Sequence, residues 1–129
     1  MNSTPKSESI IAGKAYAFAI NIIKLYKNLI ERREFVLSKQ VLRSGTSIGA
    51  NVNEAISAQS KRDFVHKLSI SLKEARETIY WLRLLKDSDY INETDFNKMF
   101  LGCDELIKIL TRIILTTKEK YFNKSNTNS

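Results

Sequence analysis

The chain of 129 residues is long enough for one domain with a buried core, and it carries a net charge of +7. Four glycines and one proline are few for a protein of short strands and turns, so the composition favours helices. No basic start precedes an apolar run, and no apolar stretch approaches the roughly 20 residues of a membrane helix, which predicts a soluble, cytoplasmic protein. A single cysteine and a single histidine exclude an internal disulfide and a Cys/His zinc cluster.

Apolar residues recur at steps of three and four in four blocks, and each block predicts an amphipathic helix. The first helix ends near Arg33, the third runs from about Asp63 to Lys86 after Ser60 as N-cap, and Asn92 caps the fourth. The predicted inward positions are Ile11, Ala15, Phe18, Ile22, Leu25, Leu29; Leu37, Val41, Gly45, Ile48, Val52, Ala55; Phe64, Leu68, Leu72, Ala75, Ile79, Leu82; and Phe96, Met99, Cys103, Leu106, Leu110, Ile114, Tyr121.

Short connections make successive helices fold back on each other. The predicted fold is therefore all-α, an antiparallel up-down-up-down four-helix bundle over residues 1–122. Residues 123–129, NKSNTNS, have nothing apolar to bury and are predicted to form a disordered tail.

The second predicted helix contains Gly45 and Gly49, although each glycine costs about 1 kcal/mol of helix propensity relative to alanine. A glycine face lets a neighbouring backbone approach closely. Ser47 and Asn51 belong to an adjoining polar stripe whose side chains are able to hydrogen-bond across such a seam. We interpret these four residues as a helix seam, with a surface for RNA, DNA or a protein partner as the alternative.

Positive charge is concentrated in residues 1–86, while residues 87–129 are nearly balanced. One stripe of the third predicted helix has four cations and no acid, which suits successive phosphates of a nucleic acid. A solvated helix face is the alternative interpretation. Tyr80 on this stripe either stacks on a base or packs against a neighbouring helix. The stripe consists of Arg62, His66, Ser69, Lys73, Arg76, Tyr80 and Arg83.

Another flank of the same helix carries Ile70, Trp81 and Leu84, more apolar surface than an exterior face requires. A subunit interface in a homo-oligomer accounts for it, or Trp81 covers an edge of the bundle.

The sequence gives little support for a catalytic function. The lone His66 is predicted to lie on the surface and Cys103 in the core, on different helices, so no nucleophile has a base beside it. Glu74 and Glu77 lie off the core stripe, which indicates a salt-bridged or interface pair rather than a di-metal site. We therefore expect no enzymatic activity, no cofactor and no metal.

The segment 38–58, SKQVLRSGTSIGANVNEAISA, resembles the signature of the bacterial four helix bundle family, first noticed as reading frames inside intervening sequences of large-subunit ribosomal RNA genes. The similarity extends over residues 15–115 and includes EARETIYWLRLL at residues 74–85. This sequence departs from the family pattern at Leu42, where many members carry an arginine before the arginine that corresponds to Arg43. The matching positions on the second helix are Gln40, Arg43, Ser44, Ser47, Ile48, Ala50, Asn51 and Glu54.

This family resembles the accessory variability protein of diversity-generating retroelements, a pentameric barrel of four-helix subunits that binds nucleic acid and a reverse transcriptase. The resemblance implies a homo-oligomer, a pentamer, with RNA or DNA bound and a protein partner such as a reverse transcriptase. The same resemblance adds Arg43 to the candidate nucleic-acid-binding residues. The leading hypothesis is a non-catalytic accessory protein that binds nucleic acid. The alternative is a structural or protein-interaction oligomer whose positive charge serves only solubility.

Overall fold

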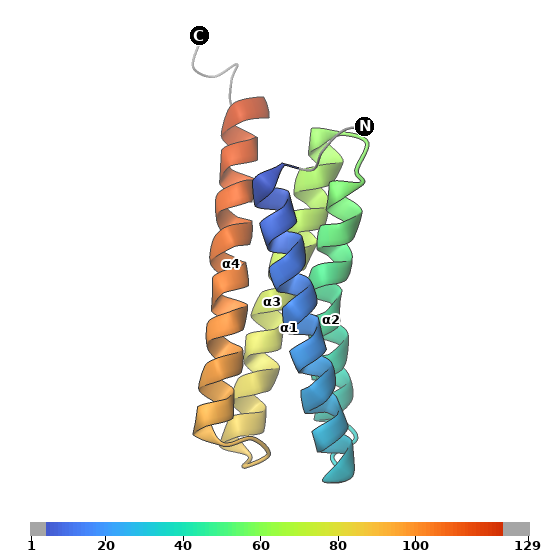
Figure 1. The fold of residues 1–129 in the computed structure, drawn as a ribbon, viewed down its shortest axis with the longest axis vertical. Coiled ribbons are helices and arrows are strands. Elements are labelled where there is room, and N and C mark those ends of the chain that lie inside the picture. The colour runs from blue at the N-terminus through green and yellow to red at the C-terminus, as the bar shows by residue number, and fades with distance from the viewer. Residues whose placement is uncertain (1–4, 123–129) are drawn as a thin grey trace.

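A computed structural model describes residues 5–122, which form four α-helices and no strand (Figure 1). α1 spans Lys6–Glu31, α2 Leu37–Ile56, α3 Lys61–Asp87 and α4 Glu93–Tyr121. Successive helices run antiparallel, so α1 begins at the end of the bundle where α4 finishes. Each helix packs against the next in the chain, α1 packs more sparingly against α4, and the backbones of α1 and α3 do not approach each other closely. The predicted four-helix bundle is confirmed, and the predicted tail lies outside the described residues.

Two of the helices begin at the N-caps that the sequence predicts. The side chain of Ser60 accepts a hydrogen bond from the backbone of Asp63 at 3.0 Å, and that of Asn92 accepts one from Asp95 at 2.7 Å. Each cap satisfies a backbone amide that has no partner inside its helix. None of the four described helices is long and apolar enough to cross a membrane.

The α1–α2 and α3–α4 turns share a geometry that is usually built with glycine. Arg33 and Asp89 have φ angles of 63° and 66°, the left-handed conformation that ends many helices. In both turns the next amide donates to a carbonyl five residues back, which closes a Schellman motif. These hydrogen bonds run from Glu34 N to Leu29 O (2.9 Å) and from Tyr90 N to Leu85 O (2.8 Å).

The core contains most of the predicted inward residues, but its edges differ. Leu25, Leu37, Leu72, Ile79 and Met99 are only partly buried and pack around the core. Tyr121 was predicted inward and is exposed: it lies in the last turn of α4, where the side chain of Lys61, the first residue of α3, lies over its ring at 4.9 Å.

Two hydroxyl residues, Ser71 and Thr78, occupy the middle of the buried face of α3 and are fully buried. Ser71 donates to the carbonyl of Ile48 at 2.8 Å, and the hydroxyls of Thr78 and Ser44 share a hydrogen bond of 2.9 Å. A buried hydroxyl needs such a partner, so these bonds fix how α3 is turned against α2. They explain why Leu72 and Ile79 lie at the edge of the core.

The glycine seam is present, and it faces α1. A Cβ atom on Gly45 would lie 2.7 Å from Cγ1 of Ile22, closer than real Cβ atoms approach, and one on Gly49 would lie 3.5 Å from Cβ of Ala15. Gly45 is therefore the position that permits the close approach of α1.

Ser47 and Asn51 do not cross the seam, contrary to the prediction. Ser47 donates to the carbonyl of Arg43 at 2.6 Å, and Asn51 donates to the carbonyl of Ser47 at 2.9 Å. Both side chains lie on the flank of α2, where carbonyls of their own helix, four residues back, are the nearest acceptors. The buried hydrogen bonds between α2 and α3 come instead from the hydroxyls of Ser71 and Thr78.

Replacing Gly45 with alanine should lower the free energy of unfolding by about 1 to 3 kcal/mol relative to Gly49→Ala, because the added methyl group overpacks against the fully buried Ile22 while both variants gain the same helix propensity. Gly49→Ala is the matched control. Its methyl group meets Ala15 at an ordinary contact distance, and about 1 kcal/mol of helix propensity offsets any cost. Gly49→Leu, which extends further toward the backbone of α1, should again cost about 1 to 3 kcal/mol. Thermal unfolding followed by circular dichroism checks this order, and equal stability of the two alanine variants would contradict it.

Candidate nucleic-acid interface

The predicted basic stripe forms the outward face of α3, and we call it the α3 basic face. All seven of its residues are exposed, and they lie opposite the buried stripe of the helix. Within residues 5–122, none of its four cations pairs with a carboxylate. Arg62 lies over the ring of Phe122 at 5.8 Å, which leaves its charge uncompensated. The face therefore presents four uncompensated charges along about 30 Å, at 1.5 Å per residue.

Tyr80 is the aromatic residue of the α3 basic face, and 54% of its surface is exposed. Its aromatic neighbour belongs to the same helix: the rings of Tyr80 and Trp81 meet edge to face, with centroids 5.1 Å apart. The indole of Trp81 donates to the Glu77 carboxylate at 3.0 Å. Of the two interpretations of Tyr80, packing against a neighbouring helix therefore receives no support.

Arg43 is engaged within the bundle. Its guanidinium donates to Glu74 at 2.9 Å and also to Glu77, so one cation of α2 bridges two carboxylates of α3. The side chain of Glu74 is only 14% exposed. Glu74 and Glu77 are thus a salt-bridged pair, as one interpretation of the sequence held. A contact of Arg43 with nucleic acid stays a prediction, but its charge already has two partners.

Ile70, Trp81 and Leu84 lie along the flank of α3 and are partly buried. Trp81 packs against the hydrophobic core, which agrees with the interpretation that it covers an edge of the bundle. None of the three belongs to the exposed large hydrophobic residues of the described helices.

The larger apolar surface is on α1, and sequence reasoning missed it. We call it the α1 outer face, and it consists of the exposed residues Ile10, Gly13, Tyr16, Ala17 and Ile20. Tyr16 is 70% exposed. Lys14, the one charged residue between Ile10 and Ile23, pairs with Glu105 of α4 at 3.2 Å. Apolar and small residues at 10, 13, 17 and 20 repeat with a helical period outside the inward stripe, and this was the available signal.

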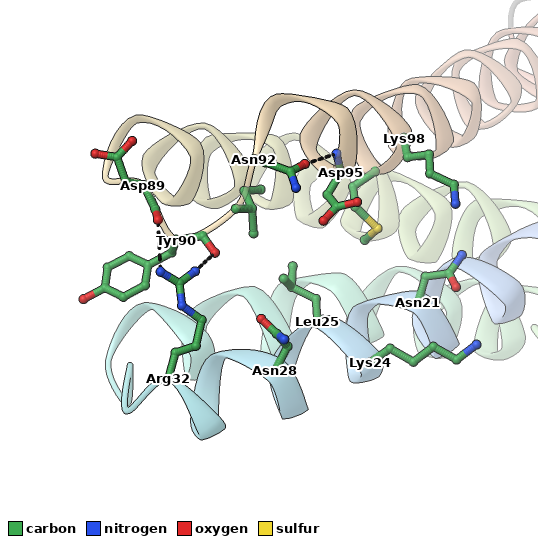
Figure 2. Close-up of a pocket in the computed structure, with 12 residues that line it drawn as sticks. Asn21, Lys24, Leu25, Asn28, Arg32, Asp89, Tyr90, Asn92, Asp95 and Lys98 are labelled. Atoms are coloured by element: carbon green, nitrogen blue, oxygen red, sulfur yellow. Dashed lines mark hydrogen bonds between the residues drawn. The ribbon is translucent and has the colours of Figure 1, made fainter.

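A groove of about 760 Å³ lies between α1, the α3–α4 turn and the start of α4 (Figure 2). Leu25, Ile91 and Met99 supply its apolar part, and amide and charged side chains surround them. Arg32 joins its two sides, donating to the carbonyls of Asp89 at 3.1 Å and of Tyr90. Its charged residues, Lys24, Arg32, Asp89, Asp95 and Lys98, are of both signs. The groove thus lacks the uniform positive charge of the α3 basic face.

The reactive side chains are placed as predicted. His66 is exposed on α3, and Cys103 is fully buried on α4, where its thiol lies 3.2 Å from the carbonyl of Ala75. Burial, helped by the nearby Asp104, raises the pKa of Cys103 to about 12, so the thiolate is scarce near neutrality. In the described part of the chain no three His, Cys, Asp or Glu side chains gather to hold a metal ion. Cys103 is therefore a core residue.

Taken together, fold and surface define a basic four-helix bundle in which one helix presents a row of uncompensated cations. The family model described as 23S rRNA-intervening sequence protein matches residues 7–112. This range is most of the chain, and the protein belongs to that family.

One similar solved structure comes from Bacteroides thetaiotaomicron, a protein of unknown function from the S23 ribosomal protein family. It shares 49% sequence identity with this chain and superposes with a TM-score of 0.83, over 84% of this chain and 97% of the other. Among curated proteins no significant match to this chain is found. The comparisons thus establish the family and the fold.

Replacing Arg43 with glutamine should destabilise the protein by about 1 kcal/mol, because it leaves two neighbouring carboxylates, one of them mostly buried, without a cation. Arg76→Gln is the matched control, since Arg76 is exposed and unpaired among the described residues. Urea unfolding measures both variants. Equal midpoints would show that the Arg43 bridge contributes nothing to stability.

Proposed function

We propose that the protein is a homo-oligomeric, non-catalytic accessory protein that binds nucleic acid through the α3 basic face. The observation that carries this proposal is the row of Arg62, Lys73, Arg76 and Arg83, all exposed and all without a carboxylate partner within residues 5–122. Cations in such a row neutralise phosphates and release the counterions condensed on them. By contrast, Arg43 and Lys67 pair with glutamates of the adjacent helix.

The relatives support RNA as the first ligand to test. The matching family is named for intervening sequences of 23S rRNA, and the similar Bacteroides protein is assigned to a ribosomal protein family. An oligomer without physiological nucleic acid remains the second candidate, favoured by the apolar α1 outer face, which has the character of a protein interface.

Self-association through the α1 outer face is the second part of the proposal, and a second copy of the chain is its partner. A protein with a net charge of +7 repels its own copies wherever cations face each other. The α1 outer face carries no charge, and Gly13 leaves open space where a neighbouring helix is able to approach. Since the backbones of α1 and α3 do not approach each other closely, assembly through the α1 outer face leaves the α3 basic face free.

Reversing Arg62, Lys73, Arg76 and Arg83 to glutamate should abolish binding to RNA and DNA, while helicity and oligomer size stay unchanged because these side chains are exposed. For the unaltered protein, affinity should fall with salt at a log-log slope of about −0.9 for each duplex phosphate neutralised. Fluorescence anisotropy with labelled oligonucleotides measures both effects.

The matched control reverses four exposed cations of α4, Lys98, Arg112, Lys118 and Lys120, and so makes the same change in net charge. It should weaken binding far less, because only long-range attraction is lost. Equal losses in both variants would indicate nonspecific attraction. If the unaltered protein binds no probe at low ionic strength, the nucleic-acid proposal fails and the structural oligomer becomes the better account.

The oligomer, for which the family resemblance implies five copies, should dissociate when Tyr16 and Ile20 are both replaced by glutamate, because association would then bury charges. Leu101→Glu with Leu115→Glu is the control, since both leucines are exposed on α4 among charged residues. Ile70→Glu tests the flank that the sequence suggested as the interface. Light scattering reports the size of each variant. A monomeric unaltered protein at micromolar concentration would refute self-association.

A further inference from the structure

We infer that the α3 basic face is a site for single-stranded nucleic acid, in which Tyr80 stacks on an unpaired base. This inference rests on the proposed function and narrows its ligand. A continuous row of cations alone would serve duplex and single strand alike, because both offer phosphates. The exposed ring of Tyr80 within the row adds a contact that only an accessible base face is able to use.

The position of Tyr80 suits this role. On a helix, residues three and four apart are neighbours, so Arg76 and Arg83 flank Tyr80 on the same face, before and after it. All three side chains are exposed. A strand that places phosphates on the two arginines, which lie about 10 Å apart along the helix axis, passes over the ring between them. Alternation of cations and aromatic rings is how sequence-tolerant single-strand sites are built.

Contacts behind the ring hold it in place. Trp81 meets Tyr80 edge to face at 5.1 Å, its indole is fixed by Glu77 at 3.0 Å, and Glu77 is bound by Arg43 of α2. This series of contacts connects an exposed ring to the seam between α2 and α3. A ring already held in one orientation loses less conformational entropy when a base stacks on it. Tyr16 offers the contrast, because it is exposed on a face without cations.

A duplex is unable to use this contact without opening, because its base faces are covered by the neighbouring base pairs. It would meet the α3 basic face only through its phosphates. Stacking of one base on an aromatic side chain is worth roughly 5- to 150-fold in affinity. Stacking on Tyr80 should therefore raise the affinity for a single strand by a factor in this range, against the stronger phosphate attraction of a duplex.

The test compares a single-stranded oligouridylate with a fully paired RNA duplex of the same length, both at low ionic strength. Tyr80→Leu should weaken binding of the single strand roughly 5- to 150-fold and leave duplex binding unchanged. Tyr80→Phe keeps the ring and should restore single-strand binding. Phe35→Leu, the matched control at an exposed aromatic residue of the α1–α2 turn, should change neither. An unchanged single-strand affinity in Tyr80→Leu, or an equal loss on both probes, would overturn the inference while leaving the proposed function intact.

Trp81 provides a second readout, because it is the single tryptophan of the chain and touches Tyr80. Single-strand binding should change the fluorescence of Trp81 in the unaltered protein, and duplex binding should change it much less. Equal responses to the two probes would overturn the stacking contact. Absence of salt-sensitive binding to either probe would instead overturn the proposed function itself.

Discussion

The packing of α2 against both of its neighbours is the constraint on which the surface of this protein depends. On one side Gly45 leaves room for the buried Ile22 of α1. On the other, buried hydroxyls of Ser71 and Thr78 bind partners on α2. Turning α3 about its axis would leave the hydroxyls of Ser71 and Ser44 buried without partners, at a cost of about 1 to 3 kcal/mol each, while Thr78 would keep the carbonyl of Glu74 in its own helix. The same bonds that fix the core therefore hold the cations of α3 outward.

The positively charged residues of this bundle have two different roles. Arg43 lies between two glutamates of α3, and Lys67 pairs with Glu54 at 2.9 Å, so these cations connect α2 and α3. Ser44 and Ile48 of α2 also bind α3. Much of the family pattern on α2 thus serves the packing of two helices. The cations of the α3 basic face, which have no carboxylate partner within residues 5–122, lie on the outward side of the same helix.

The sequence predicts the helices well because apolar periodicity and N-caps are local signals. Ser60 and Asn92 cap α3 and α4 as expected. The sequence fails to predict contacts between residues that are distant in the chain. Ser71 and Thr78 are polar, so hydropathy places them outside a core that they in fact occupy. Arg33 and Asp89 adopt the left-handed conformation that glycine usually adopts, and the sequence has no glycine there to predict it.

The sequence predicts the candidate site as far as it predicts which residues share one face of a helix. The exposure of the α3 basic face follows from its phase relative to the apolar stripe, and the structure agrees. The sequence does not predict which cations pair with carboxylates, because the carboxylates beside Arg43 lie more than thirty positions away in the chain. The orientation of Tyr80 against Trp81 likewise depends on side-chain packing in three dimensions.

Lysine footprinting by mass spectrometry tests the central claim, that the α3 basic face contacts nucleic acid, most directly. Lys73 is the one lysine on this face, and Lys24 of α1 and Lys98 of α4 are exposed references elsewhere. An oligonucleotide present in excess should slow acetylation of Lys73 and leave the rates at Lys24 and Lys98 unchanged. Unchanged acetylation of Lys73 in the presence of bound oligonucleotide, with protection of lysines on other helices, would contradict the account.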